Sequence, residues 1–476
     1  MKRKIGLLLI LSLAFFSSGV LAAGLPAYGA DEGVIIYEVT SGDILFAQKQ
    51  NEKFYPASTT KLMTALVAIE NGDLNENITV GDEIASLDED SSTAGLEAEE
   101  VLSLNELLYA LLLPSGNDAA ETIAVNIGKK IAGDSSISAD KAYEAFIAAM
   151  NKKAKEMGMT GTNFTNPHGL HNDKHYTTAA DMLILTRTAF EETTIKAITR
   201  AKVHEVQTNK TKHKWNNSNL LLYSNFTELS EEYRVANNLS GTNPVFNGYA
   251  SSGKTGFTEE ANKCLVFEGE GNDKNMIGII LNADETVIFK EASDTINAVV
   301  KEYELLEWST PEAEDQVVQV VNYHVFDGNK LKYQTNDPLI TAVPQANQAD
   351  YTAKVKWDET KVMGDETLAN LETDLKAGEQ IGELQVYNGE TFVEATPLYA
   401  VNDMKARNWT DYPILYWYVT IIVILILLAI LRIMFVQFMR KNNIRYKKIK
   451  IKKKSNSSSR RPSNGRSSNQ PPKRRR

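Results

Sequence analysis

A single charge-free stretch near the C-terminus limits what this chain can fold into. No charged residue occurs between Asp411 and Arg432, and the 18 residues Ile414–Leu431 are apolar or nearly so, which is long enough to span a bilayer. The 16 Lys and Arg residues of Arg440–Arg476 have no acidic residue among them, and such a basic flank marks the cytoplasmic side. We therefore expect a transmembrane helix over 412–436 and a basic, disordered cytoplasmic tail over 437–476. The alternative is a buried helix of a soluble domain, which the basic flank disfavours.

The N-terminus has the layout of a secretory signal peptide. A basic start, Met1–Lys4, precedes the mostly apolar Ile5–Val20, and small residues follow, as is typical of cleaved export signals. Residues 1–30 are therefore interpreted as a signal peptide, and the body of the chain is expected outside the cell membrane.

Charge and cysteine content describe this external body further. All 61 acidic residues lie between residues 31 and 411, so the body repels polyanions, which disfavours nucleic acid as a partner outside the cell. The basic tail is interpreted as a topology anchor, with anionic lipid or nucleic acid inside the cell as the alternative. Cys264 is the only cysteine, so no intrachain disulfide forms and stability must come from core packing.

Three short motifs in fixed order carry the chemistry: Ser-Thr-Thr-Lys at Ser58–Lys61, Ser-Gly-Asn at Ser115–Asn117, and Lys-Thr-Gly at Lys254–Gly256. Together they offer a serine nucleophile, a lysine to deprotonate it, and a second serine and lysine to relay the proton. Ser-x-x-Lys alone is a weak signal, because it recurs at Ser138 and at Ser251. The Ser138 copy opens a helix of alternating charges and is interpreted as an ordinary cap.

The Ser58 copy differs because Lys61 leads directly into an apolar run. A helix beginning at Ser58 places Ser58 and Lys61 on one face at its amino end, where the helix dipole favours a nucleophile. Lys61 must be neutral to act as a base, and burial or the neighbouring cation of Lys254 would lower its pKa. An N-cap serine with a surface lysine is the alternative, which the two other motifs disfavour.

The expected elements form an α/β body over 31–308 and a small all-β domain over 312–400, since 476 residues exceed one ordinary core. In the α/β body we predict a hairpin of Val34–Val39 and Ile44–Ala47, and strands Lys263–Gly269 and Asn275–Asn282. Three helices are also predicted there: one from Ser58 to a stop at Gly72, one from a Ser103–Glu106 capping box to Leu113, and one from Ala139. After Thr310-Pro311, the all-β domain is expected to contain strands such as Val317–Tyr323 and Tyr351–Lys356.

Four segments closely resemble the D-alanyl-D-alanine carboxypeptidases, the low-molecular-weight penicillin-binding proteins: Tyr55–Ala65, Leu113–Ala120, Asn166–Leu170 and Gly253–Thr258. The resemblance covers about residues 31–305. It implies a penicillin-recognising catalytic domain of the β-lactamase and DD-peptidase type, followed by a β-rich domain. It also implies peptidoglycan stem peptides ending in D-Ala-D-Ala as substrate and β-lactam antibiotics as inhibitors. We expect no cofactor and no metal.

The resemblance also implies a role for each motif residue. Ser58 attacks the carbonyl of the penultimate D-Ala and Lys61 takes its proton. Ser115 passes a proton to the departing D-Ala, while Asn117 orients Lys61 and the substrate.

The last motif is expected to bind substrate. Lys254 and Thr255 meet the terminal carboxylate, and Gly256 lies between them and Phe257. The backbone amides of Ser58 and Phe257 form the oxyanion hole.

The chain departs from the family pattern in three places. Many relatives bring an arginine to the substrate carboxylate from the strand after Lys-Thr-Gly, and Ile279–Glu291 contains none, so Lys254 and Thr255 are expected to act alone. The stretch Arg200–Ser252 is longer than usual, so the rim of the site is expected to differ. A spanning helix replaces the usual amphipathic surface helix.

Three histidines, His168, His171 and His175, raise the question of a metal site. They have no nearby Cys and no Glu in helical register, which disfavours zinc. We expect Asn166–Thr178 to be a polar loop packed near the active site.

Two alternatives remain beside a membrane-anchored carboxypeptidase. A serine β-lactamase would need a deacylating carboxylate, and the Glu-x-x-Leu-Asn pattern that usually supplies it is not found between the second and third motifs. A non-catalytic wall-binding or β-lactam-sensing protein is the other, although the tail is too short for an intracellular effector domain.

Overall fold

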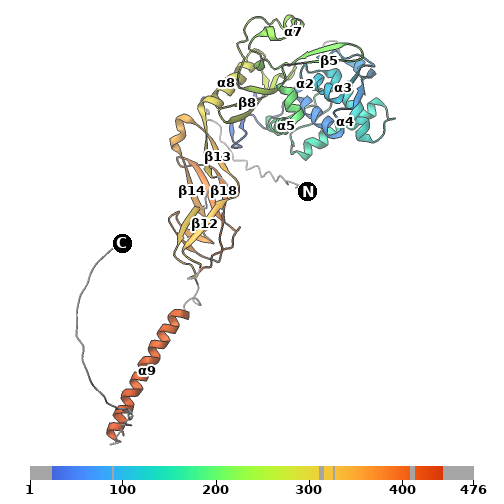
Figure 1. Cartoon of the computed structure of the whole chain (residues 1–476). Coiled ribbons are helices and arrows are strands. Elements are labelled where there is room, and N and C mark those ends of the chain that lie inside the picture. Colours follow the sequence, from blue (N-terminus) through green and yellow to red (C-terminus); the bar gives the residue numbers. More distant parts are fainter. Residues whose placement is uncertain (1–23, 88–90, 310–315, 325–326, 408–412, 443–476) are drawn as a thin grey trace, which may run out of the picture. The chain divides into compact units, whose positions relative to one another are not determined.

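The computed structural model describes residues 24–87, 91–309, 316–324, 327–407 and 413–442 (Figure 1). Most of the predicted signal peptide and most of the predicted basic tail lie outside the described residues. The contacts divide the chain into two units, of which the first ends at Ala406 and the second contains the C-terminal helix.

The centre of the first unit is a five-stranded antiparallel sheet in the order β2-β1-β9-β8-β7. Its strands are β1 Gly33–Glu38, β2 Ile44–Gln48, β7 Ala250–Thr258, β8 Asn262–Gly271 and β9 Lys274–Ala283. The predicted hairpin and the two predicted strands after Lys-Thr-Gly are thereby confirmed. In this sheet β7 is an edge strand, so its outer side remains open to a ligand.

Alternating side chains of the sheet enter two hydrophobic cores, as a period of two requires. Ile35, Val266 and Ile279 belong to the larger core, which is shared with most helices, and Val34 and Leu265 belong to a second core with α8. The described helices of this unit are α1 Lys61–Asn71, α2 Leu104–Leu112, α3 Asn117–Ala132, α4 Ala139–Glu156, α5 Ala179–Glu191, α6 Thr193–Arg200, α7 Glu231–Ala236 and α8 Ile288–Glu302.

The helix starts follow local sequence signals, with one correction. Ser103 accepts from Glu106 N at the start of α2, and Ser138 accepts from Lys141 N at the start of α4, so Ser138 is a helix cap as predicted. The helix predicted from Ser58 begins one turn later, because Ala57–Thr60 form the 3-10 turn η1 ahead of α1. Such turns are common at helix starts.

Smaller elements complete the first part of this unit. Two short antiparallel pairs are β3 Asn77–Thr79 with β4 Val101–Ser103, and β5 Val203–Gln207 with β6 Lys212–Asn216. Further 3-10 turns are η2 Asp82–Ser86, η3 Leu220–Leu222 and η4 Phe226–Glu228.

The predicted all-β domain is a seven-stranded sheet in the order β14-β17-β18-β12-β11-β16-β15. Its strands are β11 Gln316–Val320, β12 Lys330–Thr335, β14 Tyr351–Trp357, β15 Val362–Gly364, β16 Leu368–Leu371, β17 Gln380–Asn388 and β18 Thr391–Ala400. A separate pair, β10 Tyr303–Ser309 with β13 Leu339–Pro344, joins this domain to the first part. The 3-10 turn η5 Gln345–Asp350 follows β13.

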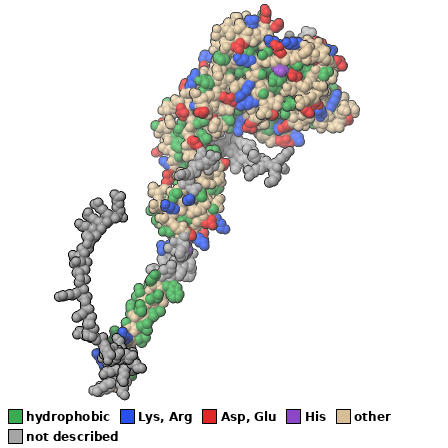
Figure 2. Space-filling model, in the orientation of Figure 1, with side chains coloured by type: hydrophobic (Ala, Val, Ile, Leu, Met, Phe, Trp, Pro, Cys, Tyr) green, Lys and Arg blue, Asp and Glu red, His purple; other side chains and the backbone are tan. Residues whose placement is uncertain are grey.

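The second unit contains α9, Pro413–Lys441. Within its segment Tyr416–Lys441, an 18-residue window has a mean hydropathy of 3.1, none of it buried, and Figure 2 shows hydrophobic side chains covering this helix. By length and composition, this helix can cross a membrane.

Candidate active site

The η1 turn presents Ser58 at the surface and directs Lys61 inward. Ser58 is partly exposed, whereas Lys61 is fully buried. Ala57 holds φ at +45° and Thr59 Oγ1 donates to Pro56 O at 2.6 Å, which fixes the turn. Because Ser58 caps no helix and Lys61 is not on the surface, the interpretation of this motif as a capping serine with a solvated lysine is wrong.

The Lys61 amine has three close oxygen neighbours. Its Nζ lies 2.7 Å from Asn117 Oδ1, 2.9 Å from His168 O and 3.0 Å from Ser58 Oγ. The first two oxygens only accept hydrogen bonds, whereas a hydroxyl also donates. A neutral amine has two hydrogens and one lone pair. Once the two hydrogens are donated to Asn117 and His168, the lone pair is left to accept the Ser58 proton.

Burial supplies this neutral state. Desolvation lowers the pKa of Lys61 well below its usual value, the charge of Lys254 lowers it further, and Asp118 opposes this shift. Asp118 is itself occupied, because it accepts from the backbone amides of Ala94 and Leu96. The carboxylate therefore fixes the neighbouring loop without touching the amine.

The second motif lies between α2 and α3, with Ser115 in the connecting loop and Asn117 as the first residue of α3. Ser115 has φ of +65°, a conformation that non-glycine residues rarely adopt. Its Oγ accepts from Lys254 Nζ at 2.9 Å. The loop thus brings the second hydroxyl onto the second amine.

The third motif lies on the edge strand β7. Lys254 is buried, and it also donates to Thr255 O at 2.8 Å. Burial, and then the charge of Lys263, lower its pKa from 10.5 to about 7. Thr255 Oγ1 is 2.6 Å from Ser218 Oγ. The site therefore holds two amines of depressed basicity next to two hydroxyls.

Close backbone packing brings β7 against η1. A methyl group added at Gly256 would lie 2.9 Å from Ser58 N, so only glycine allows this approach. Phe257 follows with half of its side chain exposed. The open edge of β7 next to Ser58 is thus available to an extended ligand.

The loop Asn166–Thr178 packs against the site, as predicted. His168 Nε2 lies 3.0 Å from Glu121 Oε1, with both side chains buried, and His175 Nε2 lies 2.9 Å from Thr60 Oγ1. His171 faces Asp173 and Glu260 instead. Each of the three imidazoles has its own partner, so the loop braces η1 and Lys61.

Sequence reasoning brought the motif residues together but missed their supports. The sequence did not predict the hydrogen bond between Ser218 and Thr255 or the contact between Glu121 and His168. The stretch Arg200–Ser252, which contains Ser218, was predicted only to change the rim of the site. No pattern in the sequence signals these contacts, because they join residues that are distant in the chain.

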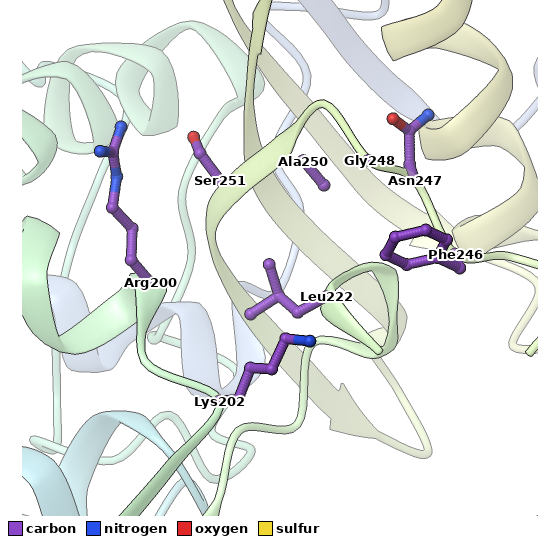
Figure 3. Close-up of a pocket in the computed structure, with 8 residues that line it drawn as sticks. All are labelled: Arg200, Lys202, Leu222, Phe246, Asn247, Gly248, Ala250 and Ser251. Atoms are coloured by element: carbon purple, nitrogen blue, oxygen red, sulfur yellow. The ribbon is translucent and has the colours of Figure 1, made fainter. Parts of the chain in front are cut away.

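A separate hollow lies near the first residues of β7 (Figure 3). Its lining is Arg200, Lys202, Leu222, Phe246, Asn247, Gly248, Ala250 and Ser251. The cations there are already paired, Lys202 with Glu228 and Arg200 with Glu268 and Glu270. None of the three motifs lines this hollow, so we assign the site to the amine and hydroxyl network.

Comparison with known proteins gives the family and the fold. The family model described as D-alanyl-D-alanine carboxypeptidase matches residues 22–285, and that described as penicillin-binding protein 5, C-terminal domain, matches residues 306–406. The chain is 25% identical over 386 residues to D-alanyl-D-alanine carboxypeptidase DacF of Bacillus subtilis, covering 80% of this chain and 87% of that protein.

Other matches agree. A D-alanyl-D-alanine carboxypeptidase of a Streptomyces strain is 28% identical over 265 residues, 54% of this chain and 81% of that one. The crystal structure of D-alanyl-D-alanine carboxypeptidase DacD from Francisella tularensis has a TM-score of 0.62 at 21% identity, covering 82% of this chain and 96% of that chain. At that identity the structural match shows the shared fold.

Proposed function

Because this chain belongs to the D-alanyl-D-alanine carboxypeptidase family of serine-type peptidases, we propose that it removes the terminal D-Ala from peptidoglycan stem pentapeptides through an acyl-enzyme on Ser58. The observation that carries the proposal is the position of Lys61 Nζ, 3.0 Å from Ser58 Oγ and held by two acceptor oxygens. Such an amine is oriented to accept the hydroxyl proton.

Acylation begins when Ser58 Oγ attacks the carbonyl carbon of the penultimate D-Ala while its proton moves to Lys61 Nζ. The carbonyl oxygen becomes an oxyanion, which the backbone amides of Ser58 and Phe257 stabilise. Each such donor contributes about 2.7–4 kcal/mol. The close approach of Gly256 to Ser58 N supports this pairing.

Collapse of the tetrahedral intermediate breaks the C–N bond, and the departing nitrogen needs a proton. Ser115 Oγ donates its proton to that nitrogen and recovers one from Lys254 Nζ, its neighbour at 2.9 Å. The terminal carboxylate lies against Lys254 and Thr255. A bound anion raises the pKa of Lys254, so the substrate itself charges the proton donor.

Water then hydrolyses the acyl-enzyme and frees Ser58. A β-lactam acylates Ser58 by the same first step, but its leaving nitrogen stays tethered to the acyl group and obstructs the approaching water. The adduct is therefore expected to persist, which makes β-lactams inhibitors.

The anchoring of the enzyme follows from α9. We propose that this helix crosses the cell membrane, with the catalytic domain outside and the basic tail in the cytoplasm, because the basic residues follow the helix. Peptidoglycan lies on the outer side, and the β-rich domain acts as a spacer between the site and the membrane.

The test uses the full chain in detergent with a stem pentapeptide and with penicillin. D-Ala release together with a persistent adduct on Ser58, located by mass spectrometry, is the expected result. Ser58→Ala should abolish both. Ser138→Ala is the matched control, because that Ser-x-x-Lys copy only caps a helix. Rapid penicillin turnover would instead indicate a β-lactamase, and neither activity would indicate a binding protein.

A further inference from the structure

Lys263 is a cation beside the site that the mechanism above does not use. It lies on β8 directly opposite Phe257, and its Nζ is 5.5 Å from the centre of that ring. Its side chain is half-buried and forms no hydrogen bond or ion pair within the described part of the chain. Because this side chain is half removed from water, an ammonium without a hydrogen-bond or ion-pair partner here points to a ligand as its partner.

The register places this ammonium next to the third motif. Side chains alternate across a strand, so Thr255 and Phe257 share one face of the sheet, and Lys263 shares it as the residue opposite Phe257. Thr255 is then a diagonal neighbour of Lys263, at about 7–8 Å between Cα positions, within reach of a long side chain. Lys263 can therefore extend to the hydroxyl expected to meet the substrate carboxylate.

The electrostatics of the site also favour an anion there. The charge of Lys263 contributes to the lowered pKa of Lys254, so the two amines repel each other. Burial lowers the pKa of Lys263, and Glu285 opposes this shift but forms no ion pair with Lys263 among the described contacts. Lys254 already donates to Ser115 and to Thr255 O, whereas Lys263 has no such commitment. A carboxylate at Thr255 would relieve the repulsion and give Lys263 its partner.

We propose that Lys263 is a substrate-binding residue that holds the C-terminal carboxylate of the stem peptide together with Thr255 Oγ1. This inference rests on the proposed carboxypeptidase function and assigns the selection for a free peptide terminus to a residue outside the three motifs. Lys254 remains the partner of Ser115 in proton transfer, and Lys263 supplies the charge that recognises the terminus.

The experiment compares a pentapeptide with a free C-terminus and the same peptide with an amidated C-terminus, using the full chain in detergent. Lys263→Met should lower kcat/KM for the free peptide by about 10- to 100-fold, the range of a hydrogen bond to a charged group, and leave that for the amidated peptide unchanged. Lys263→Arg should restore most of the loss. Lys274→Met is the control, since Lys274 lies at the opposite end of the β8–β9 pair.

A binding measurement separates this inference from the proposed function. In a Ser58→Ala background, calorimetry with the two peptides should show that Lys263→Met weakens binding of the free peptide and not of the amidated one. If the unaltered enzyme releases no D-Ala, the carboxypeptidase proposal fails while this binding comparison still tests Lys263. An equal loss with both peptides, or no loss with either, would overturn the role of Lys263.

Discussion

Replacing Lys254 with methionine should make the protein more stable at neutral pH than at alkaline pH, relative to the unaltered chain. The ammonium is fully buried, and its pKa falls from 10.5 to about 7 in the fold. Below pH 7 both the folded and the unfolded chain carry the charge, so the fold bears the whole cost of burying it. Above pH 10.5 both are neutral and that cost is absent. Methionine removes it at every pH.

The magnitude follows from the displaced pKa. A pKa difference of one unit corresponds to about 1.36 kcal/mol, so the fall from 10.5 to about 7 corresponds to about 5 kcal/mol. Between these pH values the unfolded chain binds one more proton than the folded one, so the stability of the unaltered chain rises with pH. The variant lacks this slope at position 254. Lys61 adds to the difference with the same sign, because losing the Lys254 charge raises its pKa.

The assay is urea unfolding of the full chain in detergent at pH 6 to 10, followed by tryptophan fluorescence. Lost hydrogen bonds to Ser115 and to Thr255 O shift the variant by a nearly constant amount, so the change with pH isolates the titration. We expect the free energy of unfolding of the variant, minus that of the unaltered chain, to fall by several kcal/mol from pH 6 to pH 10. A difference that stays constant over this range would refute the buried, perturbed amine.

Three further predictions test the rest of the account. Asn117→Asp replaces the amide oxygen that lies 2.7 Å from Lys61 Nζ with a carboxylate, which raises the pKa of Lys61. The acidic limb of the pH profile of kcat/KM should therefore move to higher pH. An unmoved limb would contradict Lys61 as the base. Gly169 has a φ of +88°, and Gly169→Ala would place a methyl group 1.9 Å from a backbone carbonyl oxygen of η1. This variant should lower the melting temperature and slow penicillin labelling. Gly158→Ala is the control and should have smaller effects, because Gly158 has a similar φ of +86° but no atom within 4 Å of the added methyl group. A chain ending at Ala406 lacks α9 and should move to the soluble fraction with D-Ala release intact, whereas membrane retention would rule out α9 as the only anchor.

Local patterns were sufficient to predict several elements around the motifs, but not α3, α6 or α8. The helix from Ala139 and the strands after Lys-Thr-Gly lie where periodicity and turn residues placed them, because each signal acts within a few residues. The start at Ser58 was wrong by a turn, because Ala57–Thr60 form a 3-10 turn ahead of α1. Gly169 packs closely against Ala57 in this turn, and the η1 sequence contains no sign of that contact.

The site divides in the same way. The motifs identified the hydroxyls and amines that meet in the site. They did not identify the contacts that orient them, such as that between Glu121 and His168 and the hydrogen bond between Ser218 and Thr255. Lys263 shows the limit most clearly. In the sequence it is one lysine in a strand, and its relation to Lys254 depends on the antiparallel register of β7 and β8.

The scatter of the motifs along the chain has a physical reason. Two amines buried close together destabilise a fold unless at least one is neutral, so neither Lys61 nor Lys254 could be held by its local helix or strand alone. The larger hydrophobic core, which joins the helices to one face of the sheet, supplies the packing that offsets this cost. The tertiary fold brings η1, the Ser115 loop and β7 to one edge of that core. It thereby removes the amines of Lys61 and Lys254 from water together. The chemistry therefore depends on the same packing that stabilises the domain, and mutations that loosen this core should raise the pKa of Lys61 and reduce activity before the protein unfolds.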